Sequence, residues 1–263
     1  MKYDNIVPGI FRKRINRFVA IVEIDGKEES VHVKNTGRCR ELLQDGVKAS
    51  LQKCSNPSRK TRYDLIAVYR EGCGWVNLDS QACNQVVREW LEAGNQQVSL
   101  ETRGSRNQQV PSETRGFGAP FSLFPGISFL KPEYSYGRSR VDFYLECAER
   151  RILIEVKGCT LAIGGRVYFP DAPTERGVKH LQELVSAGKE GYESYVAFVI
   201  AIPGVRRVYP NDRTHPEFGA ALRRAVQEGV KILYLTCDVS ADELKISGAE
   251  LCQEVPFTEP EPT

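Results

Sequence analysis

The sequence has no long hydrophobic run, and this absence narrows what the protein can be. No apolar stretch approaches the roughly 18 to 20 residues that cross a bilayer. The N-terminal segment, MKYDNIVPGIFRKR, also lacks the apolar core of a secretory signal. We therefore expect a cytoplasmic protein with no membrane partner. The chain has 263 residues, 41% of them hydrophobic and 27% charged, which is long enough for one large or two ordinary globular domains.

Paired cysteine motifs are absent and histidines are scarce. None of the eight cysteines stands in a C-x-x-C spacing or beside a histidine in sequence, so a zinc site has no support from spacing. Only three histidines occur, which disfavours a metal site built mainly from imidazole. Disulfides remain an alternative, but reduced and partly buried thiols are the expected state in the cytoplasm.

An excess of charge of one sign is also absent overall, but not locally. The formal net charge is +2, yet residues 1–78 hold 15 Lys and Arg against 9 Asp and Glu, a balance of +6. The remainder of the chain carries a balance of −4. A basic region beside an acidic one favours a polyanion as partner of the first.

Short strands joined by turns predict a small barrel at the N-terminus. A hairpin is expected over 17–33, with its turn at Asp25-Gly26. Further strands are expected over 47–52, 63–70 and 74–78, with a short helix over 38–43. Five short strands within about 80 residues fit a barrel of the OB type. We expect residues 1–80 to form an OB-like, nucleic-acid-binding domain.

The rest of the chain alternates strands and helices. Apolar periodicity predicts helices over 79–94, 174–191 and 216–229. Strands are expected over 129–136, within 139–158 and over 194–202, and a last strand over 230–239. This order is typical of βαβ units on a parallel or mixed sheet. We expect a domain over 81–256, a long surface loop over about 99–127 and a tail over 257–263.

Charges interrupt the two apolar strands of the segment SRVDFYLECAERRILIEVKG. Glu155 and Lys157 lie two residues apart and therefore face one side of a strand, and a tight turn can bring Asp142 close to them. Two carboxylates and an ammonium suit Mg²⁺, with Mn²⁺ as an alternative ion, and the attack of a metal-bound water on phosphorus. Asp142 and Glu155 would hold the metal. On spacing alone, a solvated surface strand explains the same residues.

Longer motifs resemble a known family. VHVKNTGRCREL (31–42), SRVDF (139–143), EVKG (155–158) and FPDAPTERGVKHLQEL (169–184) are similar to the sugar fermentation stimulation protein A family. The resemblance implies a mixed α/β protein with an N-terminal OB-like β-barrel and a C-terminal PD-(D/E)XK nuclease-like domain. It also implies DNA binding without marked sequence preference, and a link to the regulation of sugar metabolism.

The resemblance further implies a set of site residues. Asp142, Glu155 and Lys157 match the nuclease-like triad, and Glu89 matches the place where such cores often add a carboxylate. A second group would line the same cleft: Arg140, Arg176, Lys179 and His180. His180 is either a proton-transfer group or a hydrogen-bonded helix histidine.

The N-terminal domain offers its own candidates for nucleic-acid contacts. The expected basic residues are Lys34, Arg38, Arg40, Arg59, Lys60 and Arg62. Phe11, Phe18, Tyr63 and Trp75 could stack on bases, although aromatic side chains in a small barrel more often fill its core.

Three functions follow from these observations. The leading hypothesis is a DNA-binding protein whose barrel delivers nucleic acid, single- or double-stranded, to a Mg²⁺-dependent phosphodiester-hydrolysing site. The alternative is a non-catalytic, sequence-nonspecific DNA-binding regulator that keeps the nuclease fold. The third is an enzyme acting on small phosphate-containing molecules. Arg103, Arg106 and Arg115 of the long loop either extend the nucleic-acid surface or only keep the loop soluble.

Overall fold

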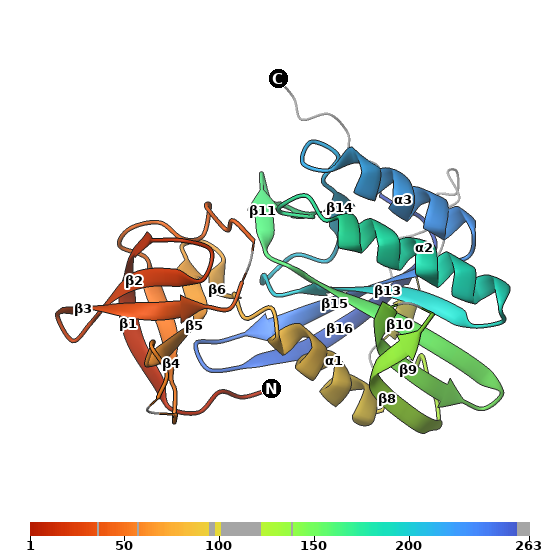
Figure 1. The fold of residues 1–263 in the computed structure, drawn as a ribbon, viewed down its shortest axis with the longest axis horizontal. Helices are drawn as coiled ribbons and strands as arrows, with labels where there is room; N and C mark the ends of the chain where they lie inside the picture. The colour runs from red at the N-terminus through yellow and green to blue at the C-terminus, as the bar shows by residue number, and fades with distance from the viewer. Residues whose placement is uncertain (36, 57, 95–97, 101–121, 138, 257–263) are drawn as a thin grey trace, which may run out of the picture.

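The structure is a computed structural model that describes all residues except 36, 57, 95–97, 101–121, 138 and 257–263. It shows a β-barrel beside a layered α/β domain (Figure 1). The predicted mixed α/β class with an OB-like barrel is confirmed. Most of the expected loop, residues 101–121, and all of the expected tail lie outside the described residues, as do Arg103, Arg106 and Arg115.

The barrel consists of six strands in the order β3-β2-β1-β4-β5-β6, and a parallel pairing of β3 with β5 closes it. Alternate side chains of these strands fill its core, among them Val22, Leu51 and Leu65, which are fully buried. The strands are β1 (Ile6–Arg14), β2 (Val19–Ile24), β3 (Lys27–Val33), β4 (Lys48–Lys53), β5 (Tyr63–Arg70) and β6 (Gly74–Asn77).

Strand β1 was not predicted, because Pro8 and Gly9 interrupt its pattern. The structure explains the glycine: a Cβ at position 9 would lie 2.7 Å from side-chain atoms of both Leu51 and Val22. The helix expected over 38–43 is wrong. The amides of Leu42 and Leu43 both donate to the Cys39 carbonyl, forming a single turn. Cys39 adopts a φ of 46°, which is incompatible with a right-handed helix.

The second domain is built on a seven-stranded mixed sheet in the order β7-β16-β15-β13-β10-β9-β8. In the described part of the domain, three helices cover it: α1 (Ala82–Glu92), α2 (Glu175–Lys189) and α3 (Pro216–Gln227). The Thr174 hydroxyl accepts a hydrogen bond from the Gly177 amide and caps α2. The strands are β7 (Val98–Leu100), β8 (Ile127–Tyr136), β9 (Ser139–Cys147), β10 (Arg150–Cys159), β13 (Glu193–Ile200), β15 (Lys231–Val239) and β16 (Leu244–Cys252).

Several strands correct the sequence prediction. β16 follows the strand that was expected to be the last, and β7 lies at the start of the expected loop and pairs with β16. A small separate sheet was also missed, because its strands are only three or four residues long. It consists of β11 (Leu161–Ile163), β12 (Arg166–Phe169) and β14 (Val208–Pro210).

Both faces of the large sheet are buried. On β13, Tyr195 and Ala197 face the cluster that contains α1, whereas Val196 and Phe198 face the cluster that contains α2 and α3. Figure 1 shows α2 and α3 on one side of the sheet and α1 on the other. Each large side chain buried in this way contributes about 1.5 to 3 kcal/mol. The near-continuous apolar run 194–202 is explained by this two-sided burial.

The first residues of the chain belong to the α/β domain rather than to the barrel. The Met1 ammonium donates to the Leu244 carbonyl over 2.7 Å, and the Tyr3 amide donates to the Asp242 carbonyl over 2.8 Å. The chain then enters the barrel at β1. All eight cysteines are free thiols. Among the described residues, no helix combines the length and the apolar character that crossing a bilayer requires.

Glu193 ties three neighbouring strands together at the end of the sheet where all three begin. It accepts hydrogen bonds from Arg150 on β10, at 2.6 and 2.9 Å, and from Lys231 on β15, at 3.1 Å. The hydrogen bonds from Arg150 have the largest effect on this carboxylate. They outweigh its partial burial and lower the pKa of Glu193 to about 2.

Because this folded-state pKa is depressed, the stabilisation from Glu193 is present above the ordinary pKa of about 4.5 and is lost as the pH falls toward 2. We expect Glu193→Gln to lower the free energy of unfolding by about 1 kcal/mol near neutral pH, a value reduced for partial exposure. The gap between the two proteins should shrink below about pH 4. Urea unfolding of both proteins between about pH 2 and 7 measures this difference in free energy. A difference that does not change with pH would contradict the lowered pKa of Glu193.

Candidate functional site

The Asp142 carboxylate is fixed beside strand β10. β9 and β10 pair antiparallel, with Ile154 opposite Phe143. This pairing brings Asp142, the residue before Phe143, next to the part of β10 that carries Glu155 and Lys157. The Val156 amide donates to Asp142 Oδ2 over 2.7 Å, and Asn84 of α1 donates to Oδ1 over 2.8 Å. The predicted approach of Asp142 to this part of β10 is confirmed.

Glu155 lies deeper than Asp142, with 3% of its surface exposed. Lys157 Nζ lies 2.5 Å from Glu155 Oε1, and His180 Nδ1 contacts the same oxygen. Arg176 Nε donates to His180 Nε2 over 3.2 Å, so the ring proton of a neutral His180 is on Nδ1 and is donated to Glu155. His180 and Arg176 therefore orient the buried carboxylate.

The two carboxylates have pKa values shifted in opposite directions. Burial raises the pKa of Asp142, and the nearby charge of Glu155 raises it further. Burial also opposes ionisation of Glu155, but the hydrogen bonds from His180 and Lys157 outweigh it and lower the pKa of Glu155. Glu155 is thus held in its ionised form by its neighbours, whereas the ionised form of Asp142 would be stabilised by a nearby cation.

A cavity of about 930 Å³ opens over Asp142. The residues predicted to share the cleft do so: Arg140, Arg176, Lys179 and His180 all line it together with Asp142. Its basic residues are partly offset by two acids, because Glu133 and Glu175 are also in the lining. Arg140 pairs with Glu133 over 2.7 Å at an exposed position.

Glu89 does not join the other two carboxylates. It lies on α1 five residues after Asn84, on another face of the helix, and its carboxylate pairs with the terminal ammonium of Met1 over 2.6 Å. In the part of the chain that the structure describes, no three His, Cys, Asp or Glu side chains form a group that could hold a metal. A catalytic role for Glu89 therefore has no geometric support.

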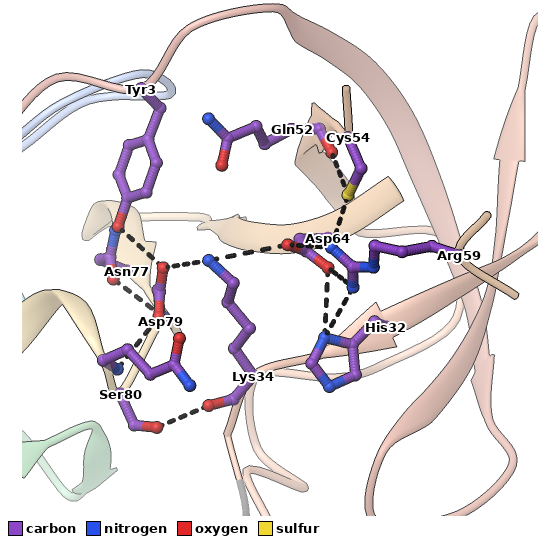
Figure 2. A network of polar contacts seen from close by, with 11 residues as sticks. Tyr3, His32, Lys34, Gln52, Cys54, Arg59, Asp64, Asn77, Asp79 and Ser80 are labelled. Atoms are coloured by element: carbon purple, nitrogen blue, oxygen red, sulfur yellow. Dashed lines mark hydrogen bonds and ion pairs between the residues drawn. The ribbon is translucent and has the colours of Figure 1, made fainter. Parts of the chain in front are cut away.

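Two of the predicted barrel cations are held in an internal network (Figure 2). Lys34 Nζ lies 2.9 Å from Asp79 Oδ2 and 3.6 Å from Asp64 Oδ2, and Arg59 binds Asp64 over 2.7 Å. Asp64 is on β5 and Asp79 lies in the short segment between β6 and α1, so Lys34 joins the barrel to the start of the α/β domain.

The other four predicted cations of the barrel are exposed. Arg62 pairs with Glu29 over 2.7 Å. Arg38, Arg40 and Lys60 form no ion pair with any described residue. They remain predicted contacts for nucleic acid.

The aromatic candidates fall into different environments. Phe11 is 1% exposed and fills the barrel core, and Tyr63 and Trp75 are half-buried. Phe18, by contrast, is 53% exposed at the turn between β1 and β2. It is the aromatic of this set whose ring is available for stacking.

Comparison with known proteins identifies the family. A match to the family described as Sugar fermentation stimulation protein RE domain covers residues 81–243, and a match to the SfsA N-terminal OB domain covers 13–78. The chain belongs to the sugar fermentation stimulation protein family. It is 48% identical over 245 residues to the homolog from Desulfitobacterium hafniense, covering 93% of this chain and 95% of the relative. The homolog from Clostridium beijerinckii is 46% identical over 246 residues, covering 94% and 96%.

A solved member of the sugar fermentation stimulation protein family has the same fold. The structure of Pyrococcus furiosus SfsA in complex with Ca²⁺ superposes with a TM-score of 0.78 at 25% sequence identity, covering 98% of each chain. That relative was therefore solved with a divalent cation. In the present chain, Asp142 and Glu155 supply the hard oxygen donors that such ions prefer. Two carboxylates fit Mg²⁺, which usually keeps several waters or binds substrate phosphates as well.

Two residues of this family member that support the site were not predicted. Asn84 holds Asp142, and its only sequence signal is its place on the expected helix over 79–94. Arg14, on the unpredicted strand β1, donates to the carbonyls of Asn35, Gly37 and Arg38 and thereby fixes the loop that carries the exposed cations Arg38 and Arg40. One arginine among several basic residues gives no sign in the sequence that it fixes a loop.

Proposed function

We propose that this protein binds DNA and hydrolyses phosphodiester bonds with Mg²⁺ at Asp142, Glu155 and Lys157, with Mn²⁺ as an alternative ion. One observation carries the proposal: a fixed Asp142 lines a cavity together with Arg140, Arg176 and Lys179, and the Glu155–Lys157 pair flanks the Val156 amide that holds it. This combination of oxygen donors and cations matches the charge of a phosphodiester and of its metal ion.

The residues of the chain have separable tasks in this reaction. Arg140, Arg176 and Lys179 would bind backbone phosphates and orient the strand over Asp142. Lys157 would stabilise the negative charge that develops on the phosphate oxygens. His180 keeps Glu155 ionised and in place through its Nδ1 proton. A bound Mg²⁺ would supply a water of lowered pKa and neutralise part of the phosphate charge.

The barrel would bind the DNA and present it to this site. Its exposed cations, Arg38, Arg40, Lys60 and Arg62, contribute to the positive balance of the N-terminal region and can track a phosphate backbone. Lys34 and Arg59, which the sequence also suggested, are occupied by Asp64 and Asp79. In this proposal Lys34 holds the domains together instead, and Arg59 neutralises Asp64 within the barrel.

A cleavage assay tests the enzymatic proposal. Supercoiled plasmid, single-stranded DNA and RNA are each incubated with Mg²⁺ or Mn²⁺ and with EDTA. We expect metal-dependent products from the wild-type protein and a loss of at least about 100-fold in rate for Glu155→Gln, because a neutral amide lacks the negative charge that attracts both the metal and Lys157. DNA affinity should be retained. Equal rates for the two proteins would end the enzymatic claim.

A non-catalytic DNA-binding regulator is the second candidate, and one observation favours it. Glu155 is almost fully buried, and its Oε1 is already occupied by both Lys157 and His180. If these contacts serve only to satisfy a buried charge, no substrate will be cleaved with either ion. Binding alone would remain, with an affinity that falls steeply as salt is raised.

The exposed ring of Phe18 leads to a separate prediction for the barrel. We expect Phe18→Ser to weaken the binding of single-stranded DNA by about 1 kcal/mol or more, because base stacking on the ring is lost. Stability should change little, since the ring is 53% exposed. Fluorescence anisotropy with a labelled oligonucleotide measures the change. Ile15→Ser, at a neighbouring residue that is 54% exposed, is the matched control, and equal losses would remove the stacking role.

A further inference from the structure

A second cavity lies between the two domains, and the proposed hydrolysis makes no use of it. Its volume is about 270 Å³, just below the range of about 300 Å³ and more that is typical of small-molecule pockets. The barrel contributes Asn35 and Gly37, and the α/β domain contributes the segments 158–161 and 168–174. The first half of the sequence FPDAPTERGVKHLQEL thus lines this cavity, while Glu175, Arg176, Lys179 and His180 of the same sequence line the larger one.

The two cavities are close neighbours. Gly158, in the lining of the smaller cavity, directly follows Lys157 of the triad. Thr174 lines the smaller cavity and Glu175 the larger one, so the N-terminus of α2 separates them. A strand whose phosphate lies over Asp142 would therefore have a base within reach of the smaller cavity.

The chemistry of the smaller cavity is that of a hydrogen-bond acceptor flanked by aromatic rings. Its charged residues are Asp79 and Asp171, and Asp79 is already paired with Lys34. Asp171 accepts the Cys39 amide through Oδ2 over 3.0 Å, while its Oδ1 has no hydrogen-bond partner and its charge no ion-pair partner among the described residues. Tyr168 and Phe169 supply flat apolar surface, and Thr160 supplies a hydroxyl.

We propose that this cavity binds a guanine base, with Asp171 as the residue that recognises it. Guanine presents two adjacent donors, N1–H and N2–H, which a carboxylate can accept together. Adenine and cytosine place a ring acceptor beside their amino group, and thymine flanks its single N–H with two carbonyls, so each would set a lone pair against the Asp171 carboxylate. The aromatic side chains favour a planar ligand. The inference rests on the proposed function only for the claim that the base belongs to a bound strand.

Binding in EDTA tests the inference without hydrolysis. The probes are labelled oligonucleotides of about 12 thymidines, a length within the range that an OB fold covers. They carry one central guanosine, one central abasic site or no change. We expect the guanosine probe to bind the wild-type protein about tenfold more tightly than the abasic probe, the discrimination typical of a paired hydrogen-bond contact. In Asp171→Asn the ratio should fall close to one, because an amide cannot accept both donors.

Asp45→Asn is the matched control, because it removes an exposed barrel carboxylate and should keep the tenfold ratio. Far-UV circular dichroism shows whether Asp171→Asn is folded, and Thr160→Val provides a second, nearly isosteric variant with an expected partial loss. Free guanosine 5′-monophosphate, titrated by NMR, separates a strand-bound base from a free nucleotide.

A ratio near one for the wild-type protein, without saturable binding of the free nucleotide, would overturn the proposal. So would a tenfold ratio that persists in a folded Asp171→Asn protein. A ratio that depends on Asp171 in a protein that cleaves nothing would leave the guanine site standing and remove the enzymatic function. If no oligonucleotide binds but the nucleotide does, and only with Asp171 present, the cavity is a site for free nucleotides.

Discussion

Lys157→Ala is expected to lower Mg²⁺-dependent cleavage by at least about 100-fold, the usual effect of removing one group that stabilises transition-state charge. Its ammonium lies 2.5 Å from Glu155 Oε1, and its side chain is 13% exposed. At such a place, water screens the ammonium poorly, and its interaction with a developing charge is strong. Alanine leaves neither the charge nor a donor.

A binding measurement must accompany this assay, because Lys157 also pairs with Glu155. Since His180 still contacts Glu155 in the variant, we expect the fold to persist and DNA affinity to fall by no more than a few-fold. Lys189→Ala is the control: this lysine ends the same helix as His180, is 67% exposed and pairs with Glu228. Its cleavage rate should equal that of the wild type. If Lys157→Ala cleaved at the wild-type rate, Lys157 would have only a structural role.

Much of the α/β domain could be predicted from the sequence because it follows simple periodicities. Glu155 and Lys157 stand two residues apart within an apolar run, so the strand period placed them on one side, and the tight turn placed Asp142 opposite. The helix after Thr174 had a cap candidate in that residue and an apolar face. These signals are local, and local signals survive in a single sequence.

The parts that were missed depend on contacts between distant residues. β1 contains a proline and a glycine, and only its position between β2 and β4 makes it a strand. The side chain of Asn84 could be assigned to Asp142 only once α1 was packed on the sheet. The charge balance likewise counted Lys34 and Arg59 as available to a polyanion, because counting charges cannot tell an exposed cation from one neutralised inside the protein.

Lys34→Met is expected to lower the free energy of unfolding by about 3 kcal/mol, at the lower end of the usual range for breaking a buried ion pair. Methionine keeps the apolar stem but leaves Asp79, whose side chain is 1% exposed, without its cation. Asp79 retains the Gln81 amide and Asp64 retains Arg59, which limits the loss. Arg62→Met is the control, because its pair with Glu29 is exposed and is worth about 1 kcal/mol or less.

The position of Lys34 between the domains adds a second, independent readout. The chain has two tryptophans, Trp75 on β6 of the barrel and Trp90 on α1, so Trp90→Phe leaves a probe of the barrel and Trp75→Phe a probe of the α/β domain. In denaturant, both probes should report one transition while Lys34 joins the domains. With Lys34→Met added, the barrel transition should move to lower denaturant than that of the α/β domain, because the coupling between them is weakened. Two transitions that still coincide at an unchanged midpoint would show that contacts other than those of Lys34 hold the barrel in place.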